Sequence, residues 1–181
     1  MTCIIGVVSK GKVFIGGDSA GVDGNDMMIR KDEKVFKIGE FIFGCTSSFR
    51  MIQLIRYSFT PPKITPKRNI YEYLCTDFIN ALRECLINGG FAQKDMESEA
   101  GGVSLMGYKG RLFYIGDDYQ IGEPKDLMAA IGSGAAYSLG AMIAMKGRTG
   151  TPPEKMIDIS LRVAAHLSTG VRPPFTILHS D

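Results

Sequence analysis

Three polar residues near the start of the chain have side chains suited to nucleophilic catalysis, namely Thr2, Asp18 and Lys34. Thr2 directly follows the first methionine, Asp18 stands in GGDSAG, and Lys34 stands in EKVFKI. The three residues are equally spaced along the chain, and each lies at or just beyond one end of a predicted strand. Because adjacent antiparallel strands can bring their ends together, we expect all three at one edge of the fold, where they would form an active site.

These residue types suit acyl transfer. A threonine hydroxyl is a poor nucleophile until a base removes its proton, and a free α-amino group, with a pKa of about 7.7–8.0, is a suitable base near neutral pH. A threonine at the N-terminus therefore carries its own base. Lys34 as an ammonium would lower the cost of the alkoxide, Asp18 would keep that lysine charged and oriented, and backbone N–H groups would hold the oxyanion.

The strands that would position these residues are predicted in pairs. Residues 2–8 and 12–16 are apolar on both faces and are joined by Ser-Lys-Gly-Lys, which predicts a covered hairpin. EKVFKI and EFIFGCT predict a second pair around Gly39, and GGDSAGVDGND before them is expected to be a loop or an irregular extension. VSLMGYKGRLFYIG predicts two strands about a Tyr-Lys-Gly turn, and FTILH a last strand.

Helices are predicted in two pairs. SSFRMIQLIRYSF and residues 69–88 form the first, the latter ended by Gly89-Gly90, and AAYSLGAMIAMKG and PPEKMIDISLRVAAHLS form the second. AQKDMESEAGG is expected to be a surface loop. The order of elements argues against a doubly wound fold and for an α+β fold, a four-layer αββα sandwich of two antiparallel sheets between helical layers. The length and the absence of a linker predict a single domain over residues 1–181.

Composition argues against several function classes. A net charge of +2 and the absence of basic clusters interleaved with aromatic residues make a nucleic-acid partner unexpected. No apolar run is long enough to span a membrane and no signal peptide is evident, so we expect a cytoplasmic protein. The cysteines lack CxxC spacing and both histidines lie far from them, so neither a metal centre nor a cofactor is expected.

Several segments resemble a known family. TCIIGVVSKGKVFIGGDSAG, EKVFKIG and AAIGSGAAYSLGAM resemble proteasome β-type subunits and the bacterial heat-shock-locus V peptidase, which are N-terminal nucleophile hydrolases. DEKVFKIGEFIFGCTSSFRMIQLIRY, GYKGRLFYIGDDYQIGEP and STGVRPPFTIL resemble uncharacterised proteasome-like proteins of bacteria and phages. The resemblance implies the same αββα fold and a catalytic role for Thr2, Asp18 and Lys34. It also implies that a Gly-Ser-Gly motif helps to build the site: Gly132, Ser133 and Gly134.

Two segments depart from the family pattern. GCTSSFRM is shorter than the family's run of glycine and alanine that supplies the oxyanion amide, so Thr46 or Ser47 is expected to supply it. Near the C-terminus, the family's aspartate before a Ser-Gly pair is replaced by His166 before Thr169 and a glycine. His166 is either a titratable substitute near Ser133 or an ordinary helix residue.

The leading hypothesis is a threonine hydrolase, a peptidase that forms an acyl-enzyme on Thr2 after removal of Met1. Two alternatives are a small-molecule amidase and a non-catalytic, self-assembling scaffold in which Thr2 is an ordinary strand residue. Cys3 could replace Thr2 only if both preceding residues were removed, and alternation along the strand turns its side chain to the other face. The resemblance further implies a homo-oligomeric ring, a peptide or protein substrate, and often a separate ATPase unfoldase.

Overall fold

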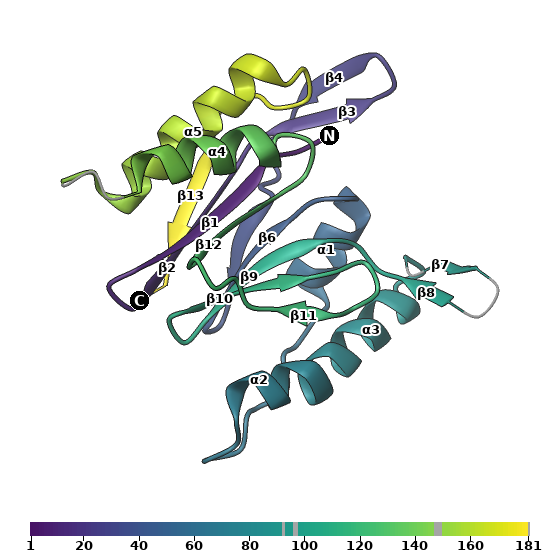
Figure 1. Cartoon of the computed structure of the whole chain (residues 1–181). Helices are drawn as coiled ribbons and strands as arrows, with labels where there is room; N and C mark the ends of the chain where they lie inside the picture. Colours follow the sequence, from purple (N-terminus) through teal and green to yellow (C-terminus); the bar gives the residue numbers. More distant parts are fainter. Residues whose placement is uncertain (92, 96–97, 147–149, 181) are drawn as a thin grey trace.

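The computed structural model describes residues 1–91, 93–95, 98–146 and 150–180. Two antiparallel sheets lie face to face, with α4 and α5 on the outer side of one and α1 to α3 on the outer side of the other (Figure 1). The predicted α+β fold, a four-layer αββα sandwich, is confirmed. The first sheet has the order β12 (Met128–Ile131), β1 (Ile4–Ser9), β2 (Lys12–Gly17), β13 (Thr176–His179). The second has the order β11 (Ile121–Gly122), β10 (Arg111–Ile115), β9 (Ser104–Tyr108), β6 (Phe41–Cys45), β5 (Val35–Ile38).

The register of the first sheet gathers three chain segments at one end. Ile4, near the start of β1, lies opposite Gly17 at the end of β2 and opposite Ile131 at the end of β12. The residues just before β1 and just after the other two strands are therefore neighbours, although they are far apart in the sequence. The N-terminus lies at this end of the sheet (Figure 1).

The helices begin and end close to the predicted positions. The α1 helix (Phe49–Tyr57) is capped by Ser48, whose side chain accepts a hydrogen bond from the Arg50 N–H. The helix predicted over residues 69–88 consists of α2 (Ile70–Tyr73), a π-helical turn (Leu74–Phe78) and α3 (Ile79–Asn88). The second pair is α4 (Ala135–Met145) and α5 (Pro153–Leu167). Among the described residues, none of these helices combines the length and apolar composition needed to cross a bilayer.

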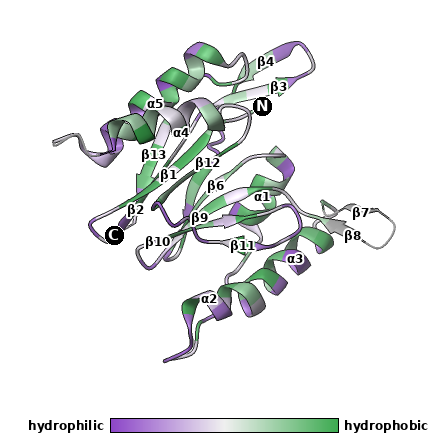
Figure 2. Ribbon diagram, in the orientation of Figure 1, coloured by the Kyte–Doolittle hydropathy of each residue, from purple (hydrophilic) through white to green (hydrophobic). Residues whose placement is uncertain are grey.

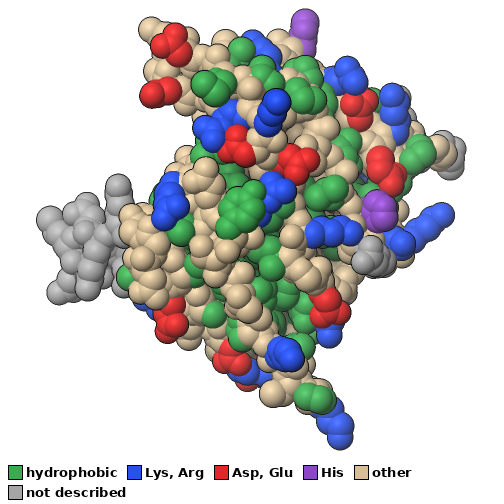
Figure 3. All heavy atoms as spheres, turned by 180° about the vertical axis from the view of Figure 1, so that it is seen from behind, with side chains coloured by type: hydrophobic (Ala, Val, Ile, Leu, Met, Phe, Trp, Pro, Cys, Tyr) green, Lys and Arg blue, Asp and Glu red, His purple; other side chains and the backbone are tan. Residues whose placement is uncertain are grey.

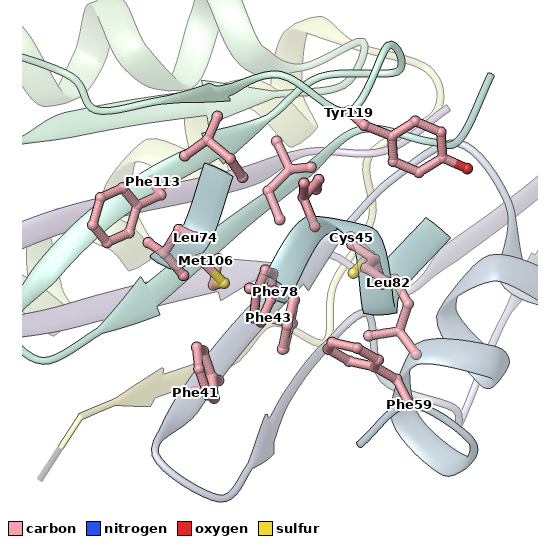
Figure 4. Close-up of a cluster of buried hydrophobic side chains, with 14 of the residues drawn as sticks. Phe41, Phe43, Cys45, Phe59, Leu74, Phe78, Leu82, Met106, Phe113 and Tyr119 are labelled. Atoms are coloured by element: carbon pink, nitrogen blue, oxygen red, sulfur yellow. The ribbon is translucent and has the colours of Figure 1, made fainter. Parts of the chain in front are cut away.

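Hydrophobic residues are concentrated between the layers, as the colouring of β1 and of the inner helix faces shows (Figure 2). Seen from behind, the surface carries acidic and basic side chains interspersed with apolar ones (Figure 3). Aliphatic side chains fill the space between the sheets, and an aromatic cluster fills the space between the second sheet and its helices (Figure 4). In that cluster the rings of Phe41 and Tyr108 stack with their centroids 4.1 Å apart. This packing makes both sheets a rigid support for their ends.

Two stretches predicted as loops contain strands, so these predictions were wrong. GGDSAGVDGND contributes to a hairpin of β3 (Ala20–Asp23) and β4 (Asp26–Ile29), and AQKDMESEAGG contains β7 (Gln93–Asp95) and β8 (Ser98–Ala100). Residues 92 and 96–97 of the second stretch lie outside the described residues. Within the described residues, each hairpin forms a two-stranded sheet of its own. In the first hairpin β4 is exposed along its whole length, so it lacks the alternation of buried and exposed residues by which strands are detected.

Candidate active site

Thr2, Asp18 and Lys34 lie together at the end of the sandwich. Thr2 precedes β1, Asp18 follows β2, and Lys34 precedes β5 of the facing sheet. The Lys34 Nζ atom lies 3.1 Å from Thr2 Oγ1 and 2.9 Å from Asp18 Oδ1, and it donates to the Ala20 carbonyl at 2.6 Å. All three side chains belong to residues that are at most 6% exposed. The equal spacing in the sequence therefore corresponds to direct contact in the structure.

The Asp18 carboxylate is held by backbone donors as well as by the lysine. Its Oδ1 accepts from the Cys3 N–H at 2.9 Å, and its Oδ2 accepts from the N–H groups of Ala20 at 2.9 Å and of Arg172 at 3.4 Å. Both oxygens are thus satisfied without water, as a buried carboxylate requires. The carboxylate links the ends of three chain segments and fixes the position of the Lys34 ammonium.

Burial lowers the pKa of Lys34 below its ordinary value of 10.5. The charge and hydrogen bond of Asp18 act in the opposite direction and raise it, but the effect of burial is the larger one. The lysine therefore loses its proton more readily than a lysine in water. Asp18 opposes this loss, and the expectation that it simply keeps the lysine charged omits the cost of burying the ammonium.

The Gly-Ser-Gly motif encloses Thr2 from the side of β12. The Thr2 N–H donates to Ser133 Oγ at 3.2 Å, and the Thr2 carbonyl accepts from Ser133 Oγ at 3.3 Å and from the Gly134 N–H at 3.1 Å. Gly132 has a φ of +90°, and a Cβ atom there would lie 2.3 Å from the Thr2 carbonyl oxygen. Glycine is thus required at this position both by the backbone conformation and by the close approach of Thr2.

Met1 occupies the position next to the predicted nucleophile. The Thr2 hydroxyl donates to the Met1 carbonyl at 2.6 Å, and the Met1 side chain lies against Thr169, with 3.9 Å between Thr169 Oγ1 and the Met1 sulfur. Because the Thr2 nitrogen is part of a peptide bond in this form, it cannot act as a base. The same nitrogen would become an amine beside Ser133 Oγ once this bond is cleaved.

A pocket of about 70 Å³ opens at Thr2 and Lys34 and contains both candidates for the oxyanion amide. The Thr46 N–H donates to the Val103 carbonyl at 3.1 Å. Ser47 has a φ of +73° and its Oγ accepts from the Val103 N–H at 3.1 Å, whereas its own N–H has no acceptor among the described residues. Ser47 is therefore the candidate whose amide is free to bind an oxyanion.

The predicted residue His166 is not brought into the site, and Cys3 lies away from it, as alternation along the strand predicts. His166 is exposed in the last turn of α5 and, within the described part of the chain, makes no hydrogen bond with Ser133. Cys3 is fully buried in the core between the first sheet and its helices, where its thiol donates to Ser138 Oγ at 3.2 Å. Burial raises the pKa of Cys3 to about 11, so this thiol is a poor nucleophile at neutral pH.

Sequence reasoning missed Arg172. Its backbone N–H donates to Asp18, and one guanidinium nitrogen donates to the carbonyls of Ala165, Ser168 and Val171, in the last turn of α5 and just beyond it. An arginine beyond a helix C-terminus is a known partner of the last carbonyls, but nothing in its position in the sequence indicates the contact with Asp18. Over the described ranges, no three acidic, histidine or cysteine side chains gather as a metal site would need.

The chain matches known proteins over most of its length. The model of the proteasome subunit family matches residues 1–167. The fold is similar to that of Thiobacillus denitrificans BPH, solved in complex with epoxomicin (TM-score 0.84, 19% identity, covering 99% of this chain and 98% of that one). It is also similar to eukaryotic HslV from Trypanosoma brucei (TM-score 0.70, 18% identity, covering 98% of each chain). A third similar structure is Anbu, an ancestral beta-subunit, from Yersinia bercovieri (TM-score 0.67, 17% identity, covering 99% of this chain and 81% of that one). The chain belongs to the proteasome subunit family.

Proposed function

We propose that this chain is an N-terminal threonine hydrolase, a peptidase that cleaves amide bonds through an acyl-enzyme on Thr2 once the Met1–Thr2 bond has been cleaved. One observation carries the proposal: Lys34 Nζ lies 3.1 Å from Thr2 Oγ1 and 2.9 Å from Asp18 Oδ1 at the edge of a pocket. A cation beside the hydroxyl lowers the free energy of the alkoxide, and the buried carboxylate holds that cation in place.

In the proposed reaction, the free α-amine of Thr2 takes the proton from Oγ1, which attacks the carbonyl carbon of the substrate amide. The Ser47 N–H donates to the resulting oxyanion, and the protonated amine returns its proton to the leaving nitrogen as the C–N bond breaks. Water, deprotonated by the same amine, then hydrolyses the ester and restores the hydroxyl. Ser133 Oγ, 3.2 Å from the Thr2 nitrogen, orients the amine during both steps.

Epoxomicin is a suitable probe because the structurally similar Thiobacillus denitrificans protein was solved in complex with it. An epoxyketone offers two electrophilic carbons, and an N-terminal threonine offers a hydroxyl and an amine. We expect the intact mass of a chain that begins at Thr2 to increase by one epoxomicin. The same chain with Thr2→Ala controls for non-specific attachment, and Thr2→Ser, which keeps a hydroxyl, should still react. A chain that begins at Thr2, remains folded and gains no mass would refute the proposal.

A non-catalytic scaffold is the second candidate, and the contacts of Met1 favour it. The Met1 carbonyl accepts a hydrogen bond from the Thr2 hydroxyl at 2.6 Å, and the Met1 side chain contacts Thr169, so the form that retains Met1 satisfies the Thr2 hydroxyl without a substrate. The mass of the protein purified from its own cells distinguishes the two candidates. Quantitative retention of Met1 would support the scaffold, and its loss would support the hydrolase.

The proposal includes assembly of the whole chain, residues 1–181, as one domain in a homo-oligomeric ring in the cytoplasm. Exposed apolar side chains support the assembly: Met27, Met28 and Ile29 on β4, and Tyr137 and Ile143 on α4. The three consecutive exposed apolar residues on β4 are the strongest candidate for a subunit contact. A peptide or protein is the proposed substrate, delivered by a separate ATPase unfoldase. Native mass spectrometry tests the assembly, and a monomer at micromolar concentration would contradict it.

A further inference from the structure

The pocket at Thr2 has an apolar wall whose composition bears on the choice of substrate. Lys34 lies on its polar side, close to the nucleophile. The apolar wall consists of three side chains from β3 and α1: Val22, Phe49 and Ile52. In Figure 1 the N-terminus lies between the β3–β4 hairpin and α1, which agrees with these contacts. The residue that supplies the scissile carbonyl has its side chain two bonds from the attacked carbon, so this is the pocket that the side chain would enter.

Phe49 is held in place by an ion pair outside the pocket. The Arg30 guanidinium carbon lies 3.8 Å from the centroid of the Phe49 ring, and its Nε and Nη2 atoms donate to the two carboxylate oxygens of Asp32 at 2.7 and 2.5 Å. The Arg30 N–H donates to the Ser19 carbonyl at 2.9 Å, beside the catalytic carboxylate. Lys34 Nζ also lies near the ring, 5.7 Å from its centroid. A cation stacked on the ring face restricts the rotation of the phenylalanine side chain.

A glycine makes room for this arrangement. A Cβ atom at Gly21 would lie 2.8 Å from Arg30 Cδ and 3.4 Å from a carbon of the Phe49 ring. The hairpin therefore approaches the ring closely enough for the arginine to cover it. A larger residue at this position would push the arginine away from the ring.

The size of the pocket sets the size of the side chain that it can accept. With Met1 in place its volume is about 70 Å³, roughly half that of a cavity of ~150 Å³ that binds benzene, so the space beside Val22, Phe49 and Ile52 suits a short aliphatic side chain better than an aromatic ring. Met1 also lines the pocket and is lost on activation, but its side chain lies against Thr169 and Gly170. Removal of Met1 therefore opens the pocket on the side of Thr169 and Gly170 and leaves Val22, Phe49 and Ile52 in place as its apolar wall.

We propose that Phe49 is a specificity-determining residue and Arg30 its positioning residue, so that the enzyme prefers a short aliphatic residue, such as valine, at the residue that supplies the scissile carbonyl. This inference rests on the threonine hydrolase function proposed above. It adds the substrate class, which the arrangement of nucleophile, lysine and carboxylate leaves undetermined.

The test uses the chain that begins at Thr2 and peptides that differ only in this residue, which is alanine, valine, leucine or phenylalanine. We expect kcat/KM for valine to exceed that for phenylalanine by at least tenfold, because a difference of a single methylene in a hydrophobic pocket already discriminates about 10–200-fold. Phe49→Ala should reduce this ratio at least tenfold by raising the rate with phenylalanine. Arg30→Met should reduce it less, and Arg30→Lys, which keeps a cation, should restore part of the preference.

Arg56→Met is the matched control for the arginine. Arg56 also lies over an aromatic ring, 5.6 Å from the centroid of Phe36, and pairs with Glu33, but none of these residues lines the pocket. We expect this variant to keep the wild-type ratio. Because the side chain of Arg30 is 30% exposed, its replacement should leave the protein folded, and circular dichroism verifies this.

Epoxomicin labelling separates the two possible failures. If the wild-type chain forms the adduct but cleaves valine and phenylalanine peptides equally, or if both Phe49→Ala and Arg30→Met leave the ratio unchanged, the specificity inference is wrong and the hydrolase function stands. If the folded chain forms no adduct and cleaves no peptide, both proposals fall together.

Discussion

The buried pair of Asp18 and Lys34 should make the stability of the protein depend on pH once the carboxylate is replaced by an amide. Every neighbour of the carboxylate is a donor: Lys34 and the Cys3 N–H at Oδ1, and the N–H groups of Ala20 and Arg172 at Oδ2. In Asp18→Asn, the amide NH₂ must face donors in either orientation. A buried donor left unsatisfied costs about 1–3 kcal/mol, and this part of the loss does not depend on pH.

The second part of the loss comes from Lys34. Without the charge of Asp18, nothing offsets the effect of burial, so its pKa in the folded variant falls further below 10.5. If Lys34 is neutral in the folded variant, folding includes the loss of its proton. For an ordinary lysine this loss costs about 4–5 kcal/mol at pH 7, and the cost falls by about 1.4 kcal/mol for each unit of higher pH. This agrees with the loss of about 3–5 kcal/mol expected when one partner of a buried ion pair is removed.

The sign of the pH dependence follows from the proton count. Between the folded pKa of Lys34 and 10.5, the unfolded chain binds more protons than the folded one, so stability rises with pH. In Asp18→Asn this range extends to lower pH than in the wild type, so the deficit of the variant should be largest near pH 6–7 and should shrink towards pH 9. The free energy of unfolding from urea titrations at several pH values measures it.

Asp126→Asn provides the control, because Asp126 pairs with Lys146 at 3.3 Å on the surface. Exposed pairs contribute about 0–1 kcal/mol, so this variant should follow the wild type at every pH. The reasoning is refuted if the deficit of Asp18→Asn is the same at pH 6 and pH 9. Lys34 would then keep its proton in the variant, and burial would not be the dominant effect on its pKa.

Three further predictions test other parts of the site. Gly132→Ala should abolish epoxomicin labelling at Thr2 and lower the free energy of unfolding by more than about 2 kcal/mol, because the methyl group would displace the Thr2 carbonyl; intact labelling would contradict this. Arg172→Gln should lower stability by about 2 kcal/mol and the melting temperature by about 4–8 °C in calorimetry, because three carbonyls lose their donor. Iodoacetamide at pH 8 should modify the exposed Cys75 and leave Cys3, whose pKa is raised to about 11, unmodified in peptide mapping; rapid modification of both would show that the buried thiol is accessible.

The four layers could be predicted because the strands and helices have local signatures. The hairpin at the start of the chain has apolar residues throughout and a short polar turn, and Ser48 caps a helix with clear periodicity. The hairpin of β3 and β4 has no such signature, since most of its side chains are exposed in the described part of the structure and need not alternate. Propensity alone does not detect strands of this kind.

The part of the site that could be predicted consists of the residues whose side chains take part in the proposed chemistry. Threonine, aspartate and lysine are recognisable by type, and the register of the first sheet then brings the first two together. The Val103 carbonyl accepts from the Thr46 N–H and not from the Ser47 N–H, which leaves the latter available to a substrate. The contact of Arg172 with Asp18 is likewise made by a backbone N–H. Contacts of this kind depend on the path of the main chain, which residue types do not encode.

The bond between Ser133 and the Thr2 N–H joins residues that are 131 positions apart, and under the proposed function this separation bears on when Met1 can be removed. During synthesis at about 5–20 residues per second, Ser133 is made roughly 7–26 s after Thr2. Until then the peptide bond before Thr2 cannot be enclosed by the Gly-Ser-Gly segment and is open to an aminopeptidase on the nascent chain. Afterwards Thr2 is only 6% exposed, so under the proposed function the fraction of chains that lose Met1 would depend on whether processing precedes folding.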